Sequence, residues 1–127
     1  MSRTPRQAAD AELAVLKVLW DAAPRTARDI AEVLYPSGAP SDIATVQKLL
    51  SRLEKKRLVE RRRQPPAHLF SPALTQDQYA GEQLDAMAEK LSDGSLTPFV
   101  LHLVNARKLT PHERQQIRKL IDGDKAR

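Results

Sequence analysis

The longest amphipathic pattern in the chain lies between residues 41 and 57. Its apolar residues recur at helical spacing and form one stripe, consisting of Ile43, Val46, Leu49, Leu50 and Leu53. The opposite face carries small, hydroxylated or basic residues, namely Ser41, Ala44, Thr45, Lys48, Ser51, Arg52 and Lys55. Such a face can enter a DNA major groove, because small side chains permit close approach and the others can bond to bases or phosphates. An ordinary solvated helix face has the same composition, so the neighbouring segments must decide between the two interpretations.

Two shorter helical patterns precede this one. The first covers residues 10–21 with Asp10 as the expected N-cap, and the second covers residues 27–34. Thr26 and Asp29 resemble a capping box that opens the second helix. The side chains expected to face inward are Leu13, Leu16, Leu19 and Trp20 from the first helix and Ile30, Val33 and Leu34 from the second.

A proline- and glycine-containing turn over residues 35–40 ends the second helix, and Ser41 or Asp42 is expected to cap the third. Three short helices, the last of them basic on its outer face, are typical of a helix-turn-helix. The basic N-terminal residues Arg3 and Arg6 are further candidates for phosphate contacts.

The periodicity changes from helix to strand after Arg57. Residues 58–63 predict a strand with Leu58 or Val59 in the core, and residues 68–72 predict a return strand with Leu69 or Phe70 buried. The intervening turn contains two prolines, which exclude a central strand. A helix-turn-helix followed by a β-hairpin is the winged-helix plan. Three consecutive arginines near the hairpin tip are candidate phosphate contacts, and the alternative is that they only keep an edge strand soluble: Arg61, Arg62 and Arg63.

Three further helices are expected after residue 75. A capping box at Thr75 opens a helix to about residue 91, an apolar helix follows over residues 96–107, and Thr110 opens a last helix that Gly123 ends. Helices of this size bury little on their own, so we expect a dimerisation region. Its candidate contacts are Leu84, Met87, Leu91, Phe99, Val100, Leu103, Val104, Ile117, Leu120 and Ile121. The alternative is that these helices fold back on the winged helix in a monomer.

Charge is distributed unevenly along the 127 residues. Residues 1–74 hold 13 basic and 8 acidic side chains, whereas residues 75–127 hold 8 of each. All of the net charge of +5 therefore lies in the first part. This asymmetry predicts two domains, a DNA-binding domain over 1–74 and a helical dimerisation region over 75–127.

Other chemistry has little support in the sequence. The chain has no cysteine, and its histidines, His68, His102 and His112, are far apart, so no metal site or cofactor is expected. No Gly-rich phosphate loop or nucleophile elbow is present, which argues against an enzyme. No apolar run reaches the roughly 20 residues of a membrane span, and we expect a cytoplasmic protein without a membrane partner.

Several segments together resemble one family. They are AELAVLKVLW, TARDIAEVL, ATVQKLLSRLEKKRLVERR and LFSPALTQDQY, within residues 10–122. The chain resembles the penicillinase-repressor and methicillin-repressor family of bacterial transcription regulators. The resemblance implies a mainly α winged-helix protein with a small β-hairpin, which acts as a homodimeric repressor on a palindromic operator of double-stranded DNA.

The resemblance also implies roles for individual residues. Base-reading residues would be Thr45, Gln47 and Lys48. Phosphate contacts would come from the third helix and the wing, namely Arg52, Arg61, Arg62 and Arg63. The polar face of the third helix itself adds three candidate phosphate contacts, Ser41, Ser51 and Lys55. Repression would end through an inducing signal, delivered by a sensor-linked protease or by a ligand. The Asn-Phe pair cleaved in the penicillinase branch corresponds to His102-Leu103 here, and Arg57 replaces a helix-ending glycine.

Two alternative functions remain at this point. One is a protein-interaction module built on a winged helix, which would have no operator. The other is a non-specific nucleic-acid-binding protein, which would bind DNA or RNA without sequence preference.

Overall fold

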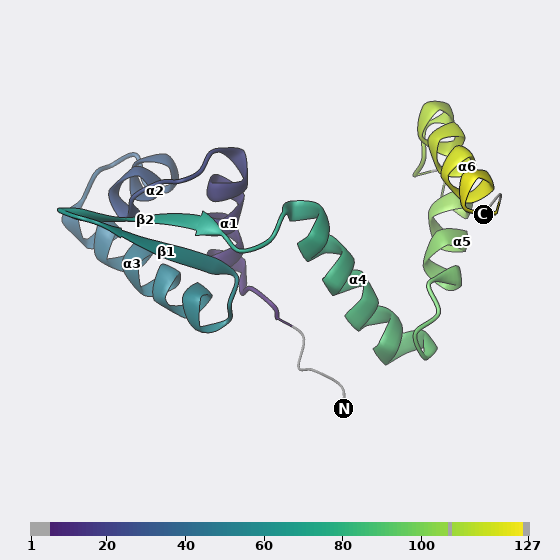
Figure 1. Cartoon of the computed structure of the whole chain (residues 1–127), viewed down its shortest axis with the longest axis horizontal. Helices are drawn as coiled ribbons and strands as arrows, with labels where there is room; N and C mark the ends of the chain where they lie inside the picture. The colour runs from purple at the N-terminus through teal and green to yellow at the C-terminus, as the bar shows by residue number, and fades with distance from the viewer. Residues whose placement is uncertain (1–5, 107, 126–127) are drawn as a thin grey trace. The chain divides into compact units, whose positions relative to one another are not determined.

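The computed structural model describes residues 6–106 and 108–125, and in this part of the chain it contains six helices and one antiparallel hairpin (Figure 1). The elements are α1 (Asp10–Asp21), α2 (Ala27–Leu34), α3 (Pro40–Lys55), β1 (Val59–Gln64), β2 (Ala67–Pro72), α4 (Gln76–Ser92), α5 (Thr97–Asn105) and α6 (Pro111–Lys125). The expected mainly α class with a small hairpin is confirmed. Two compact units are present, Met1–Leu84 and Asp85–Arg127. Their boundary falls within α4, and the functional division at residue 74 stays a prediction.

The first unit is built around one hydrophobic core, to which α1, α2, α3 and the hairpin all contribute. Its fully buried side chains include Val15, Leu16, Leu19, Ile30, Val46, Leu50, Leu53 and Leu58. The predicted stripe of the third helix faces this core, although Ile43 is only partly buried at its margin. On α2 the prediction for Val33 is wrong, because this side chain is 52% exposed while Ile30 and Leu34 pack inward.

The N-cap residues predicted for the first two helices can be compared with the structure. The capping box of α2 is confirmed, since the Asp29 N–H donates to Thr26 Oγ1 and the Thr26 N–H donates to Asp29 Oδ2, both at 3.1 Å. The predicted N-cap of α1 is one residue too late, because Asp10 is already helical and Ala9 is the cap.

The N-cap expected for α3, Ser41 or Asp42, is also wrong. The helix begins at Pro40 after Ala39, and Asp42 lies in the first turn. From there its carboxylate accepts the Ala39 N–H at 3.2 Å. Proline suits the first turn because the backbone N–H that it lacks has no helical partner there.

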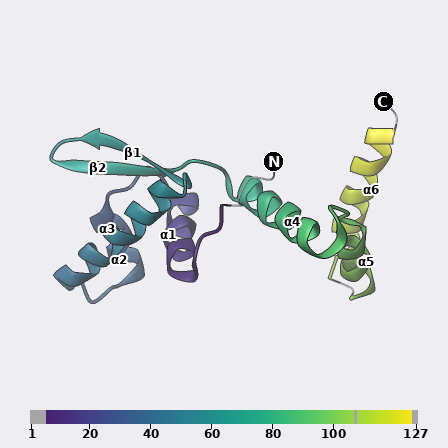
Figure 2. The ribbon, with the colours of Figure 1, turned by 90° about the horizontal axis from the view of Figure 1, so that it is seen from below.

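The hairpin packs on the helices of the first unit and is tied to them by its second strand (Figure 2). Phe70 and Arg25 exchange two backbone hydrogen bonds of 2.8 and 3.1 Å. Leu58 and Val59 are both buried, as is Phe70, whereas Leu69 is half-buried. The chain leaves α3 through Arg57, which has a φ of 62°. A left-handed residue is required at this turn, and glycine adopts that conformation at lower cost than arginine.

The helices after residue 75 begin largely as predicted. Capping boxes join Thr75 to Gln78 and Thr110 to Glu113, with backbone-to-side-chain bonds of 2.8 to 3.1 Å. Asp93 and Gly94 both have positive φ after the end of α4. The prediction that Gly123 ends the last helix is wrong, because α6 continues to Lys125. No helix among the described residues is long and apolar enough to cross a membrane.

Candidate nucleic-acid interface

The solvent face of α3 carries every polar residue that the sequence singled out on this helix. Those residues are all exposed: Ser41, Thr45, Gln47, Lys48, Ser51, Arg52 and Lys55. The Thr45 hydroxyl donates to the Ser41 carbonyl oxygen at 3.0 Å. In this arrangement the hydroxyl proton points to the backbone, and Thr45 presents an acceptor oxygen and its methyl group at the surface of the helix.

The three arginines of β1 are divided between the two faces of the hairpin. In the antiparallel register Arg61 is opposite Phe70, Arg62 is opposite Leu69 and Arg63 is opposite His68. Successive side chains on a strand point to opposite faces.

Arg61 and Arg63 therefore share the face of Phe70, which packs on the helices, whereas Arg62 points the other way. All three arginine side chains are exposed. The arginine run thus supplies cations to both faces of the wing.

Between α3, the start of α2 and the hairpin lies a groove of about 600 Å³. Its lining is Thr26, Ala27, Arg28, Ile43, Gln47, Leu50, Ser51, Glu54, Arg61, Pro66, Ala67, His68 and Phe70. Of the candidate residues on α3, Gln47 and Ser51 line this groove, whereas Thr45, Lys48 and Arg52 do not.

Arg28 and His68 line this groove, although the sequence had not predicted either of them as part of a site. Arg28 comes from the first turn of α2, and His68 comes from β2 across from Arg63. The strand register could have placed His68 beside Arg61 and Arg63, because these three side chains lie on the same face of the hairpin.

A carboxylate also lies on the wall of this groove. Glu54 Oε2 is 3.6 Å from Arg61 Nε, and both side chains are partly exposed. This ion pair holds one wing arginine against α3. An ion pair with this exposure stabilises the fold by no more than about 1 kcal/mol.

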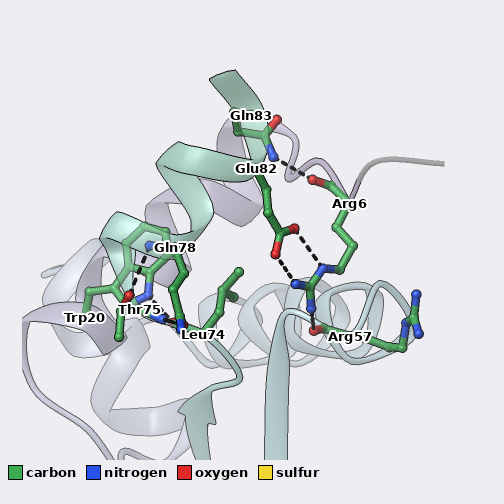
Figure 3. A network of polar contacts seen from close by, with 8 residues as sticks. All are labelled: Arg6, Trp20, Arg57, Leu74, Thr75, Gln78, Glu82 and Gln83. Carbon is green, nitrogen blue, oxygen red and sulfur yellow. Dashed lines mark hydrogen bonds and ion pairs between the residues drawn. The ribbon is translucent and has the colours of Figure 1, made fainter. Parts of the chain in front are cut away.

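Arg6 is not available for the phosphate contact that the sequence suggested. Its guanidinium pairs with the Glu82 carboxylate and donates to the Arg57 carbonyl oxygen at 2.9 Å (Figure 3). That prediction is wrong for Arg6, and Arg3 lies outside the described residues.

Glu12 is the one buried charged residue among those that the structure describes. Burial raises the pKa of Glu12, but hydrogen bonds from Lys56 and from the Ala9 N–H, with the charges of Lys56 and Arg52, outweigh burial and lower it below its usual value of 4.5. The carboxylate therefore stays ionised and anchors the end of α3 to α1.

The second unit presents a different surface. Ala88 is the only buried residue among the described side chains of 85–106 and 108–123, and Phe99 is half-buried. The other predicted dimerisation residues are exposed large hydrophobics: Leu84 in the first unit, then Met87, Leu91, Val100, Leu103, Val104, Ile117, Leu120 and Ile121. Soluble monomers seldom expose so much apolar surface.

Groups of His, Cys, Asp or Glu that could hold a metal are absent from the described residues. The first unit thus presents a basic, hydroxyl-bearing helix with a cationic hairpin beside it, and the second unit by itself presents an exposed apolar helical surface.

The sequence matches one protein family over most of its length. The sequence profile of a family described as "Penicillinase repressor" matches residues 8–123. The penicillinase repressor of Bacillus licheniformis is 24% identical over 127 residues, which is 100% of this chain and 98% of that protein.

Solved structures that match the chain at TM-scores below 0.5 include a variant of ZitR from Lactococcus lactis, with 19% identity, 99% of this chain and 79% of that chain covered, and a TM-score of 0.46. The PcaV transcriptional regulator from Streptomyces coelicolor is 20% identical, with 94% and 77% covered and a TM-score of 0.44.

Proposed function

Because the chain belongs to the penicillinase repressor family, we propose that it represses transcription by binding a palindromic DNA operator as a homodimer. The family is one of DNA-binding repressors, which are not enzymes. The observation that carries the proposal is the exposed polar face of α3 beside the cationic hairpin. A helix of this kind fits the major groove, and the hairpin then lies against the sugar–phosphate backbone.

Within this proposal the residues have distinct tasks. Thr45, Gln47 and Lys48 contact base edges, and the amide of Gln47 matches the donor and acceptor pattern of adenine. The phosphate contacts are Ser41, Ser51, Arg52, Lys55, Arg61, Arg62 and Arg63, which contribute affinity with little sequence discrimination.

The exposed apolar side chains of the second unit support the homodimer. A second copy of the chain would cover them, and two-fold symmetry would then place two α3 helices at successive turns of the duplex. Each subunit alone has half of the DNA contacts, so affinity is coupled to dimer formation.

The test is in-vitro selection of bound duplexes from a random pool with the purified protein. We expect a two-fold symmetric consensus whose half-sites lie about one helical turn apart or somewhat more. Gln47→Ala is expected to change the preferred base at one position of each half-site, whereas Arg62→Ala is expected to weaken binding to all sequences about equally.

Three results of that selection would contradict the proposal. Binding without a consensus would favour a non-specific nucleic-acid-binding protein. No DNA binding at all would favour a protein-interaction module. An asymmetric single site bound by one subunit would remove the homodimer.

A further inference from the structure

The segment of residues 6–9, called the strap below, lies between the end of α3 and the first turns of α4 and bonds to both (Figure 3). The guanidinium of Arg6 is shared between them. Its Nη1 donates to the carbonyl oxygen of Arg57 at 2.9 Å, and its Nε and Nη2 donate to the two carboxylate oxygens of Glu82, the former at 3.1 Å. One side chain therefore joins α4 to the chain just after α3, the helix proposed to enter the major groove and called the recognition helix below.

The backbone of the strap is fixed as well. Gln83 Nε2 donates to the Arg6 carbonyl oxygen at 2.6 Å, Lys56 Nζ donates to that of Gln7 at 3.0 Å, and the Ala8 N–H donates to the Tyr79 hydroxyl at 2.9 Å. Ala8 and Tyr79 are both buried. The peptide group between Arg6 and Gln7 is thus held by α4, and the peptide group between Gln7 and Ala8 is held on one side by Lys56 and on the other by Tyr79 of α4.

Trp20 of α1 attaches the start of α4 in a second way, through Leu74 just before the helix and Tyr79 in its first turn. The Trp20 indole N–H donates to the Leu74 carbonyl oxygen at 3.0 Å, and the Trp20 and Tyr79 rings lie 5.6 Å apart. Tyr79, Glu82 and Gln83 lie on one face of α4 and in successive turns, so contacts to all three restrain the direction of the helix as well as its position. The helix then continues without interruption to Ser92.

We propose that Arg6 and Glu82 are positioning residues that determine which spacing of operator half-sites the dimer accepts. This inference rests on the proposed function, because it requires a dimer that reads a palindrome. A change of one base pair moves the half-sites by about 3.4 Å and rotates them by about 34°. A recognition helix held firmly on α4 cannot follow that change, whereas a loosely attached one engages both half-sites over a wider range.

The experiment uses the full-length protein and duplexes that carry the selected half-sites at the preferred spacing and with one or two base pairs inserted or removed. For the unaltered protein, we expect affinity to fall about tenfold or more with a change of one base pair. For Glu82→Ala and Arg6→Ala, we expect the same change of spacing to lower the affinity by about threefold or less. The base preference within each half-site should stay unchanged.

Two further variants separate the effect of the Glu82 charge from that of an unrelated carboxylate on the same helix. Glu82→Gln retains a hydrogen-bond acceptor without the charge, and we expect an intermediate spacing profile. Glu89→Ala removes an exposed carboxylate from the same helix outside the strap, and its profile should match that of the unaltered protein.

The possible failures are distinguishable. If the unaltered protein binds no symmetric pair of half-sites, the proposed function fails. If it does so and the Arg6 and Glu82 variants keep the same steep spacing profile, only the inference fails. Equal weakening at every spacing, with a lowered unfolding temperature, would assign these residues a structural role and also overturn the inference.

Discussion

The two units of this protein differ in the burial of their apolar side chains, which are mostly buried in the first unit and mostly exposed in the second. In the first unit, leucines at helical spacing on α1 and α3 are fully buried against one another and against the hairpin. In the second unit, leucines, isoleucines and valines at similar spacing remain 38 to 74% exposed. Amphipathic periodicity therefore indicates that a helix has an apolar face, but not whether the partner of that face belongs to the same chain. In the first unit, the apolar helix faces are covered by other elements of the same chain. For the second unit, we propose that a second copy of the chain covers them.

The largest expected effect comes from the closed core of the first unit. Leu53 is completely buried, so Leu53→Ala removes buried methyl groups and leaves a cavity. We expect the free energy of unfolding to fall by about 2–5 kcal/mol, measured by urea denaturation. Leu91→Ala is the matched control, because this leucine is 73% exposed and should change the value by no more than about 0.5 kcal/mol in the dilute monomer.

The open surface of the second unit should respond in the opposite manner. Leu120 is 74% exposed, and we expect Leu120→Ala to raise the dissociation constant of the dimer about tenfold, measured by sedimentation equilibrium. Val33→Ala removes an exposed apolar side chain of the first unit and should leave that constant unchanged. Equal effects of the two substitutions would contradict the assignment of the dimer surface to the second unit.

The next effect is a dependence of stability on pH, caused by the buried carboxylate of the first unit. Because the folded state lowers the pKa of Glu12 below 4.5, Glu12 stabilises the first unit above that pH, and this contribution is lost as the pH falls through the lowered value. Unfolding of the protein at a series of pH values should show this acid-side loss. The Glu12→Gln variant should have a lower free energy of unfolding at neutral pH, and this free energy should fall less steeply as the pH is lowered. An equally steep fall in the variant would contradict the role of this carboxylate.

The smallest expected effect concerns two turns, one in each unit. Arg57 and Asp93 have φ values of 62° and 52°, which favour glycine. Arg57→Gly keeps the carbonyl oxygen that Arg6 binds, and we expect it to raise the unfolding free energy by up to about 1 kcal/mol. Asp93→Gly tests the same effect in the second unit by thermal denaturation, and a clear loss of stability in both variants would show that these side chains stabilise their turns.

The local elements could be predicted from the sequence because their signals are local. The capping boxes at Thr26, Thr75 and Thr110, the alternation after Arg57 and the apolar stripe of α3 each depend on residues a few positions apart. The errors at Asp10 and Asp42 have the same origin. A carboxylate three residues after the true cap can accept the N–H of the cap, so an alanine at the cap itself gives no signal.

The contacts that organise the site could not be predicted in this way. Arg6 and Glu82 are 76 positions apart, and no periodicity relates them. The groove beside α3 combines residues from α2, α3 and the hairpin, so Arg28 and Glu54 became visible as neighbours of the wing only in three dimensions. The polar face of α3 was predictable because a single helix carries all of it.

The ion pair between Glu54 and Arg61 has a consequence for the salt dependence of DNA binding. One of the three wing arginines already faces a carboxylate of the protein before any duplex arrives. The salt dependence scales with the number of cations that displace condensed counterions from the duplex. The affinity for every duplex, operator or not, is therefore expected to fall less steeply with salt than three unpaired wing arginines would give.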